Sequence, residues 1–410
     1  MMILIFRIGT TIPVPGVNTS YIKEMVGSNS LLSLYNMFVG GAFSNFTIFA
    51  LGIGPFITAS IIIQLLTIGF DSLKELQKSG EEGRKKMNAY TRYTALVLGF
   101  IQAIGITLGI VRRALQSNNL FFVSTVIITL VAGSMLVMWM GDRITEKGLG
   151  NGSSIIIFVG IISRIPTDII SVVNSVQSGT IKLWLVIILA IIMLITITLV
   201  TFINEAVRKI PVQYAKKVVG RRMVGAQNTH IPLKLAMAGV MPIIFASSFM
   251  TFPAMILQIF VKDIATQTGF WAGVYRFSIA SSNSSVGIGY TIANAIVYLL
   301  LILGFTYFYT YAMFNPAEIS GNIKRNGGFI PGIRAGKPTT DYLSSVISKL
   351  SLVGGIFLAI IAILPMIANF TNLNIAFGGT SILIVVGVAL ETIQQLESQL
   401  VTRHYKGFLE

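Results

Sequence analysis

Long apolar runs without a single charge alternate along the chain with shorter polar connections. The run Leu183–Ile203 has 21 residues and the run Leu235–Val261 has 27. A helix needs roughly 20 apolar residues to cross the hydrocarbon core of a bilayer. The pattern therefore predicts an all-α polytopic membrane protein with ten transmembrane helices. We place the spans at Met1–Ile12, Phe46–Gly69, Tyr93–Val111, Leu120–Gly141, Gly152–Ile170, Leu183–Ile203, Leu235–Phe260, Ile288–Phe314, Leu350–Ile367 and Gly378–Ile393.

Two apolar pieces near the N-terminus are shorter than a full span. Met1–Ile12 is stopped by Pro13 and gives roughly 18 Å of helix, against a hydrocarbon core of about 30 Å. Leu31–Phe43 is interrupted by two adjacent glycines. Irregular backbone is tolerated at membrane depth only where it is buried in protein or lines a cavity. We expect the second piece to be a short re-entrant helix.

Composition and charge agree with a membrane protein and give it an orientation. Hydrophobic residues make up 54% of the chain and charged residues only 11%, whereas about 25% is usual in soluble proteins. Of the 30 Lys and Arg residues, 22 lie in the connections after the second, fourth, sixth and eighth spans and in the C-terminal tail. Seven lie in or beside the connections on the other side. Because basic loops stay in the cytoplasm, both termini are predicted to be cytoplasmic.

Two pairs of segments resemble each other five spans apart. Gly52-x-x-Pro55-x-Ile57-x-Ala59-Ser60 matches Gly239-x-x-Pro242-x-Ile244-x-Ala246-Ser247, and Gly152–Ile157 matches Gly379–Ile384. Spans five apart run in opposite directions, so we predict two inverted five-helix halves, residues 1–175 and 176–410, around a central pore. Apolar, glycine-rich helices also match by chance, but two matches in the same order favour a repeat. We interpret Pro55 and Pro242 as mid-helix interruptions, which are typical of such pathways.

The side chains that catalysis or ion coupling would need are missing. There is no cysteine, and both histidines lie outside the spans. The second, fourth, sixth, seventh and eighth spans hold no Asp, Glu, His or Lys, the groups that mark ion pathways at depth. We predict no enzyme, no cofactor and no metal site. A secondary transporter of small solutes also uses inverted repeats, and a scaffold without a pore is a third reading; both stay open from the residues alone.

Isoleucines occupy the repeated positions instead. Ile57 and Ile244 are equivalent in the first pair of segments, and Ile157 and Ile384 in the second. If they face the axis, they form an apolar constriction that resists ions by dewetting. Ordinary packing against lipid or protein is the alternative for each of them.

Ten motifs follow one another along nearly the whole chain in an order that identifies one family. They are Phe6-Arg-Ile-Gly-x-x-Ile-Pro-Val-Pro-Gly16, Asn36-Met-Phe-x-Gly-Gly-Ala42, Ile48-Phe-Ala-Leu-Gly-Ile53, Ala59-Ser-Ile-Ile-Ile-Gln-Leu-Leu66, Tyr90-Thr-Arg-Tyr93, Ile144-Thr-Glu-Lys-Gly-x-Gly-Asn-Gly152, Thr229-His-x-Pro-Leu-Lys234, Phe245-Ala-Ser-Ser248, Phe329-Ile-Pro-Gly-Ile-Arg334 and Phe377-Gly-Gly-Thr-Ser381. With these motifs the chain resembles the SecY family, the channel subunits of the bacterial Sec protein translocase.

The resemblance implies four groups of site residues. The pore ring would be Ile53, Ile57, Ile157, Ile244 and Ile384. The plug, at about 31–45, would include Leu34, Asn36, Met37, Phe38, Gly40, Gly41 and Ser44. The lateral gate between the second and seventh spans would carry Gln64, Gln102, Ser247 and Ser248. Two cytoplasmic loops, at about 204–234 and 315–349, would dock a partner through Arg221, Arg222 and Arg334.

The resemblance also implies a function and partners. The chain would translocate unfolded secretory proteins across the bacterial cytoplasmic membrane and release membrane-protein helices sideways into lipid. Its partners would be the SecE and SecG subunits, the SecA motor, the translating ribosome, signal sequences and unfolded preproteins.

Overall fold

The computed structural model describes residues 1–28, 36, 39–115, 119–179, 182–214, 217–219, 222–224, 228–261, 269–280, 287–369 and 379–406. Its first half contains α1 (Met2–Gly9), α2 (Thr19–Ser28), α4 (Gly54–Gly69), α5 (Asp71–Lys78), α6 (Glu81–Gly105), η1 (Ile106–Ile110), η2 (Val111–Ala114), α7 (Leu120–Lys147), α8 (Gly152–Ile162) and α9 (Ile165–Gln177). Its second half contains α10 (Leu183–Glu205), β1 (Val207–Tyr214), β2 (Lys217–Val219), β3 (Arg222–Val224), β4 (Asn228–Lys234), α11 (Met241–Phe260), α12 (Phe270–Ile279), α13 (Ile288–Met313), α14 (Pro316–Arg325), β5 (Gly328–Phe329), α15 (Lys337–Asn369) and α16 (Gly379–Lys406).

Every predicted span corresponds to a helix, but not every helix is long. Within the described residues, seven helices are long and apolar enough to cross a membrane, and the bent pair α4–α5 raises the number to eight. The other two predicted spans correspond to α1, with 8 residues, and to α11, whose apolar part is Met241–Ala254. The helical membrane class is confirmed. The count of ten stays a prediction that depends on these two short helices.

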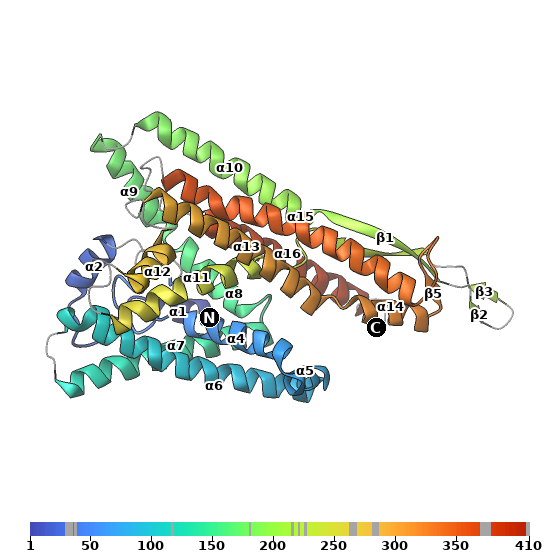
Figure 1. The fold of residues 1–410 in the computed structure, drawn as a ribbon, viewed down its shortest axis with the longest axis horizontal. Coiled ribbons are helices and arrows are strands. Elements are labelled where there is room, and N and C mark those ends of the chain that lie inside the picture. The colour runs from blue at the N-terminus through green and yellow to red at the C-terminus, as the bar shows by residue number, and fades with distance from the viewer. Residues whose placement is uncertain are drawn as a thin grey trace.

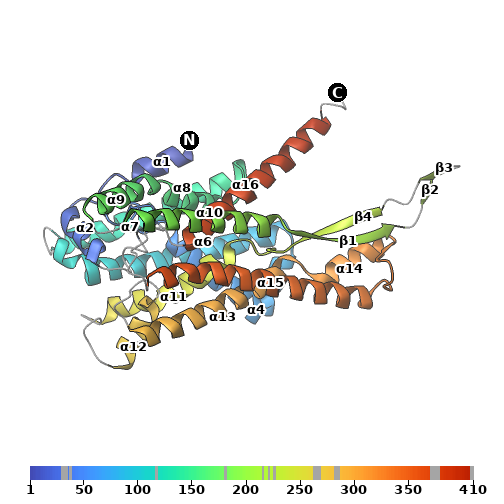
Figure 2. The same ribbon diagram turned by 90° about the horizontal axis from the view of Figure 1, so that it is seen from above.

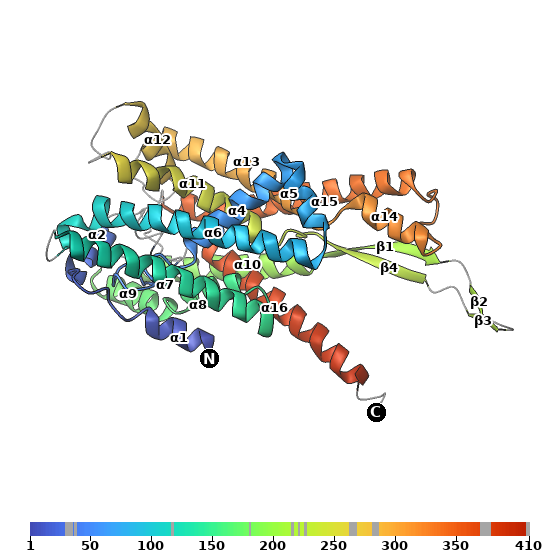
Figure 3. The same cartoon turned by 90° about the horizontal axis from the view of Figure 1, so that it is seen from below.

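The connections between the long helices separate into two ends of an elongated bundle. The helices α5 and α14 and the strands β1 to β5 lie at one end, and α2, α9 and α12 lie at the other (Figure 1). The same separation is visible from above and from below (Figures 2 and 3). The first end carries the long basic connections, as a positive-inside arrangement requires.

Each half is held together by contacts between its own helices, and two seams join the halves. In the first half α6 contacts α4 and α7, and α7 contacts α8; in the second half α13 contacts α11 and α15, and α16 contacts α10 and α15. One seam lies where α11 meets α4, α6 and η1, and we call it the front seam. The other lies where α8 meets α16, and we call it the back seam.

The repeated segments have matching backbones, although the prolines are not where we expected them. Gly52 and Gly239 both have positive φ, 54° and 58°, in the turns that precede α4 and α11. Pro55 and Pro242 therefore lie in the first turn of their helices, and the mid-helix prediction was wrong. A proline in the first turn removes no helical hydrogen bond, because its N–H would have no partner there. Pro253 is the proline that lies in the interior of α11, beyond its first turn.

The connections predicted as basic loops contain strands and a further helix. In sheet order β4-β1-β5, β1 pairs antiparallel with β4 from Val207 to Gln213 and with β5 at its far end. Buried Ile210 and Leu233 of this sheet pack with Ile323 of α14 and Leu343 of α15. The α15 helix also begins at Lys337, well before the predicted span at Leu350. The two loops thus share one small apolar core.

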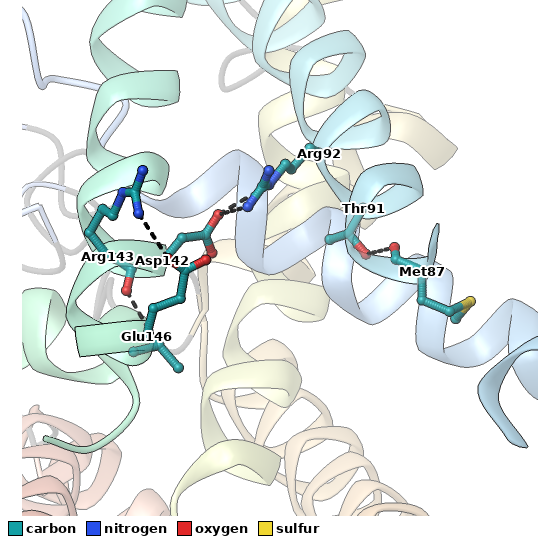
Figure 4. Close-up of polar contacts among 8 residues, drawn as sticks. Met87, Thr91, Arg92, Asp142, Arg143 and Glu146 are labelled. Carbon is teal, nitrogen blue, oxygen red and sulfur yellow. Dashed lines mark hydrogen bonds and ion pairs between the residues drawn. The ribbon is translucent and has the colours of Figure 1, made fainter. Parts of the chain in front are cut away.

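An ion pair ties α6 to α7 near the end of the bundle that carries α5. Arg92 donates to Oδ2 of Asp142 from Nε at 3.1 Å and from Nη2 at 2.7 Å (Figure 4). On the next residue, Arg143 pairs with Glu146 at 3.1 Å, and its guanidinium lies 5.7 Å from the centre of the Trp139 ring. Only the Arg92–Asp142 pair links the two helices; the contacts of Arg143 lie within α7.

Candidate functional site

The five isoleucines of the predicted ring come together in one apolar cluster. Ile53, Ile157, Ile244 and Ile384 are buried in it, and Ile57 packs against it. They come from the start of α4, from α8, from α11 and from α16, so both halves contribute. Ile57 and Ile244 occupy equivalent positions in the first turns of α4 and α11. The Ile57 N–H donates to the Ile53 carbonyl at 3.1 Å, and the Ile244 N–H donates to the Val240 carbonyl at 3.3 Å. Both repeated pairs of segments therefore contribute isoleucines to one apolar core that the two halves share.

Sequence reasoning missed a further residue of this cluster that the repeat also marks. Val240 is buried at 8% exposure and immediately precedes α11, as Ile53 precedes α4. The two residues have similar backbone angles, φ −91° and ψ −13° for Val240 against φ −92° and ψ 1° for Ile53. Extending the alignment of Gly52 with Gly239 by one residue was the signal that would have found it.

The described part of the predicted plug is a compact turn closed by its own polar groups. Asn36 is 5% exposed; its carbonyl accepts from the Gly41 N–H at 2.8 Å, and its side-chain Oδ1 accepts from the Ser44 N–H at 2.8 Å. The Ser44 hydroxyl donates to the Gly41 carbonyl at 2.9 Å. Gly40 and Gly41 need their positive φ of 68° and 86° for this turn. Leu34, Met37 and Phe38 lie outside the described residues.

The turn is seated against the same cluster as the isoleucines. Val39 and Ala42 are buried members of that cluster, at 6% and 0% exposure. Residues 39–53 form successive turns, so the predicted start of the second span at Phe46 is not helical. The segment that would carry a plug therefore contacts the site that would form a ring.

The helices predicted to form a lateral gate do meet. α11 contacts α4, with α6 and η1 beside them, and α13 supports α11 from the other side. The support is aromatic: Phe245 packs edge-on against Phe305 at 6.0 Å and Tyr309 at 6.2 Å, and Phe249 packs against Phe305 at 6.4 Å between ring centres. Such pairs add to the attraction from buried area. α11 is thus attached firmly to its own half.

The polar residues of this front seam do not bridge it. Gln64 Nε2 donates to Ser60 on its own helix at 3.3 Å, and the Ser247 hydroxyl donates to the Ile244 carbonyl at 2.9 Å. The Ser248 carbonyl accepts from the Thr251 hydroxyl, again within α11. Gln102 is 6% exposed, and its buried Oε1 has no hydrogen-bond partner among the described residues. The seam is therefore held by apolar contact and leaves one buried carbonyl unsatisfied.

The predicted docking arginines are described only in part. Arg221 lies outside the described residues, and Arg222 lies in β3. Arg334 is exposed and follows a tight turn in which the Ile333 N–H donates to the Ile330 carbonyl at 3.0 Å and Gly332 has φ 82°. Its own carbonyl accepts from the Thr339 hydroxyl at 2.8 Å. The turn holds Arg334 at the surface of the sheet-bearing end.

The described residues contain no group of three or more His, Asp or Glu that could hold a metal ion. The candidate site is an apolar cluster to which both halves contribute, beside a seam between helices.

Comparison with known proteins identifies the family. The sequence description of the SecY family matches residues 47–393. The chain is 43% identical to the protein translocase subunit SecY of Streptomyces scabiei, over all of this chain and 94% of that protein. It is also 43% identical to the protein translocase subunit SecY of Halalkalibacterium halodurans, over all of this chain and 95% of that protein.

Solved structures share the fold. One described as the structure of a protein conducting channel has a TM-score of 0.71 at 21% identity and covers 98% of this chain and 91% of its own. Sec61 in the canine ribosome-channel complex has a TM-score of 0.67 at 19% identity, with the same coverage. The family match excludes the secondary transporter that the repeat alone left open. The chain belongs to the SecY family, and it is a multi-pass membrane subunit of a protein-conducting translocation channel and not an enzyme.

Proposed function

We propose that the chain conducts unfolded secretory proteins across the bacterial cytoplasmic membrane and releases membrane-protein helices sideways into lipid, with both termini in the cytoplasm. The observation that carries the proposal is the apolar cluster that contains the repeat-related isoleucines of both halves together with Val39 and Ala42 of the proposed plug segment. An apolar ring of this kind resists ions when it is closed. Its aliphatic side chains can also widen around a passing chain without offering it a specific partner.

In this proposal the ring is Ile53, Ile57, Ile157, Ile244 and Ile384, and the plug is the segment at about 31–45, with Leu34, Asn36, Met37, Phe38, Gly40, Gly41 and Ser44. The plug covers the ring in the resting channel. An entering chain displaces it, and the ring then seals by soft apolar contact.

The lateral gate is the front seam. A signal sequence or membrane helix separates α11 from α4 and leaves into lipid. The separation breaks mostly apolar contacts, because the recorded hydrogen bonds of Gln64, Ser247 and Ser248 stay within their own helices. Opening the seam favours Gln102 energetically, because its side-chain carbonyl, which has no hydrogen-bond partner in the closed seam, can then accept a hydrogen bond from a polar partner.

The partners follow from the sheet-bearing end. The basic connection with Arg221 and Arg222 and the turn with Arg334 would dock the SecA motor or the translating ribosome, whose phosphates attract arginine. Ribosome-bound channels are among the solved structures that share the fold, which supports this assignment. The SecE and SecG subunits would complete the channel in the membrane.

The test replaces Ile57 and Ile244 by glycine and measures potassium leak from vesicles that hold the complete channel complex. We expect a large leak from the resting complex and retained translocation of a preprotein driven by SecA. A matched variant replaces Ile191 and Ile195, exposed isoleucines of α10 away from the cluster, and should not leak. A tight resting membrane in the Ile57 and Ile244 variant, or a wild-type complex that translocates nothing, would overturn the proposal.

A further inference from the structure

The short helix α12 is attached to α11, at the end of the bundle that carries α2 and α9 (Figure 1). Four of its residues are buried at helical spacing: Ala272, Tyr275, Ser278 and Ile279. Tyr275 and Ile279 share one apolar cluster with Ala254 and Leu257 of α11. The inward face of α12 is therefore packed on the helix that forms the second-half wall of the front seam.

A hydrogen bond attaches α12 to α13 as well. Nδ2 of Asn294, on α13, donates to the Phe277 carbonyl of α12 at 2.6 Å. Asn294 is only 1% exposed, so this bond is shielded from water. Because α13 also supports α11 through aromatic pairs, the three helices form one unit at this end of the bundle.

The first turn of α12 is apolar and uncovered. Phe270 is 77% exposed and Trp271 is 61% exposed, and their rings meet edge-on at 5.4 Å between centres. Arg276 is the one charged residue among the 10 of this helix. Ten residues give a helix of about 15 Å, which cannot cross a hydrocarbon core of about 30 Å. In both turned views α12 lies at the edge of the bundle (Figures 2 and 3).

Two further helices begin with exposed aromatic residues at the same end. Phe121 in the first turn of α7 is 72% exposed, and Trp184 in the first turn of α10 is 55% exposed. α7 follows η2, which contacts α2, and α10 follows α9. Tryptophan and other aromatic side chains gather where a membrane protein meets the headgroup region. The starts of α7, α10 and α12 therefore indicate the level of one membrane interface.

We propose that α12 is an interfacial anchor whose partner is lipid. Phe270 and Trp271 lie between the headgroups and the acyl chains of one leaflet, the non-cytoplasmic one in the proposed orientation. The two rings bury apolar area there, and the indole N–H donates to a phosphate or ester oxygen. Because α12 is fixed to α11 and α13, the anchor sets the depth of the end of α11. The effect on α11 rests on the proposed lateral gate, whereas the lipid contact does not.

Trp271 is itself the probe for the first test, since the chain contains three tryptophans. Trp139→Phe with Trp184→Phe keeps Trp271, and a further Trp271→Phe gives the blank that removes the signal of other subunits. The complete complex is placed in vesicles of phosphatidylethanolamine and phosphatidylglycerol with bromine at stated depths of the acyl chain. We expect bromine near the headgroup end to quench Trp271 most strongly and aqueous iodide to quench it weakly.

A matched variant that keeps only Trp184 should show the same depth profile. Strong quenching of Trp271 by iodide, with none by brominated lipid, would place α12 in water and overturn the anchor. Protection of Trp271 from both quenchers would overturn it too, because a protein surface and not lipid would then cover α12. These readings do not depend on translocation, so the proposed function can fail while the anchor stands.

The second test removes the anchor and varies the thickness of the bilayer. Phe270→Ser with Trp271→Ser changes two exposed side chains, and Leu183→Ser with Trp184→Ser does the same on α10, which lies outside the front seam. The wild-type translocation rate should change by roughly 2-fold per Å of thickness, as a mismatch cost of a fraction of a kcal/mol per Å gives.

This dependence should be much weaker in the Phe270 and Trp271 variant and should persist in the α10 variant, with equal amounts of assembled complex. Equal dependence in all three, or none in the wild type, would show that α12 does not set the depth of α11.

Discussion

The two seams between the halves of the molecule differ in what holds them. At the front seam, α11 meets α4, α6 and η1, and the recorded hydrogen bonds of the polar residues predicted for the gate stay inside their own helices. At the back seam, α8 meets α16, and the Gly150 N–H donates to Oε1 of Gln395 across the two halves at 2.6 Å. The ring cluster spans both.

This difference indicates which of the two seams can separate. Apolar contact is non-directional and can re-form around another apolar helix, such as a signal sequence. A hydrogen bond between halves keeps its geometry and resists sliding. We therefore propose that the front seam opens while the back seam keeps the halves in register.

The largest effect is expected from loosening α11 from its own half. Phe245→Ala removes an aromatic side chain that packs on Phe305 and Tyr309 of α13, at a cost of about 3–5 kcal/mol for a buried phenylalanine. Thermal unfolding of the purified complex should shift downward, and the resting gate should leak. Phe202→Ala, an exposed phenylalanine of α10, is the control. An unchanged unfolding temperature and an unchanged resting leak would mean that α13 does not anchor α11.

A smaller and opposite effect should follow from Gln102→Leu. The substitution replaces a buried carbonyl without a partner by an apolar group of similar size, and the penalty of such a group is about 1–3 kcal/mol. The closed front seam should become more stable, so preproteins with weakly hydrophobic signal sequences should translocate more slowly. Equal or faster rates would show that Gln102 finds a partner when the gate is closed.

Gln395→Leu tests the back seam. It removes the bond to the Gly150 N–H and should cost about 0.5–1.5 kcal/mol, since the bond is exposed at the bundle end. We expect a modest fall in thermal stability with little change in signal-sequence selectivity. A large change in selectivity would mean that the back seam also moves during gating, and would remove the contrast between the seams.

The smallest effect should come from Arg92→Gln. The pair with Asp142 lies within one half, and partly exposed ion pairs contribute about 0.2–1 kcal/mol. The loss of stability should shrink as salt concentration rises, because salt screens the pair in the wild type. The double variant with Asp142→Asn should lose no more than the single one. Any effect on the resting leak would show that α6 and α7 must stay paired to keep the front seam shut.

Much of the architecture follows from the sequence because apolar length and repeated motifs carry it. The runs around α7, α10 and α13 exceed the thickness of a bilayer, and the four isoleucines that the repeat singled out, Ile57, Ile157, Ile244 and Ile384, belong to or pack against one apolar cluster. The predicted boundaries of the spans were less accurate than the spans themselves. Residues 46–53 are as apolar as a helix, yet they form turns because Gly52 adopts positive φ.

What the sequence did not predict depends on contacts between distant segments. Strands β1 and β5 pair across more than 100 residues of chain, and no local pattern marks that pairing. The backbone of Gly40 lies close to that of Gly160 on α8, and glycine has no hydrophobic periodicity to reveal such a partner. The roles of the ring, plug, gate and docking residues stay predictions for the experiments above.

The small sheet at the basic end has a mechanical consequence. β1 continues from α10 with one residue between them, β4 leads within six residues into α11, and β5 leads through the Arg334 turn into α15. Because the two loops share the core of Ile210, Leu233, Ile323 and Leu343, we expect them to move as one rigid unit. A partner that pulls on either loop pulls on both. In the proposed channel such a load would reach both α11, the proposed gate helix, and α15.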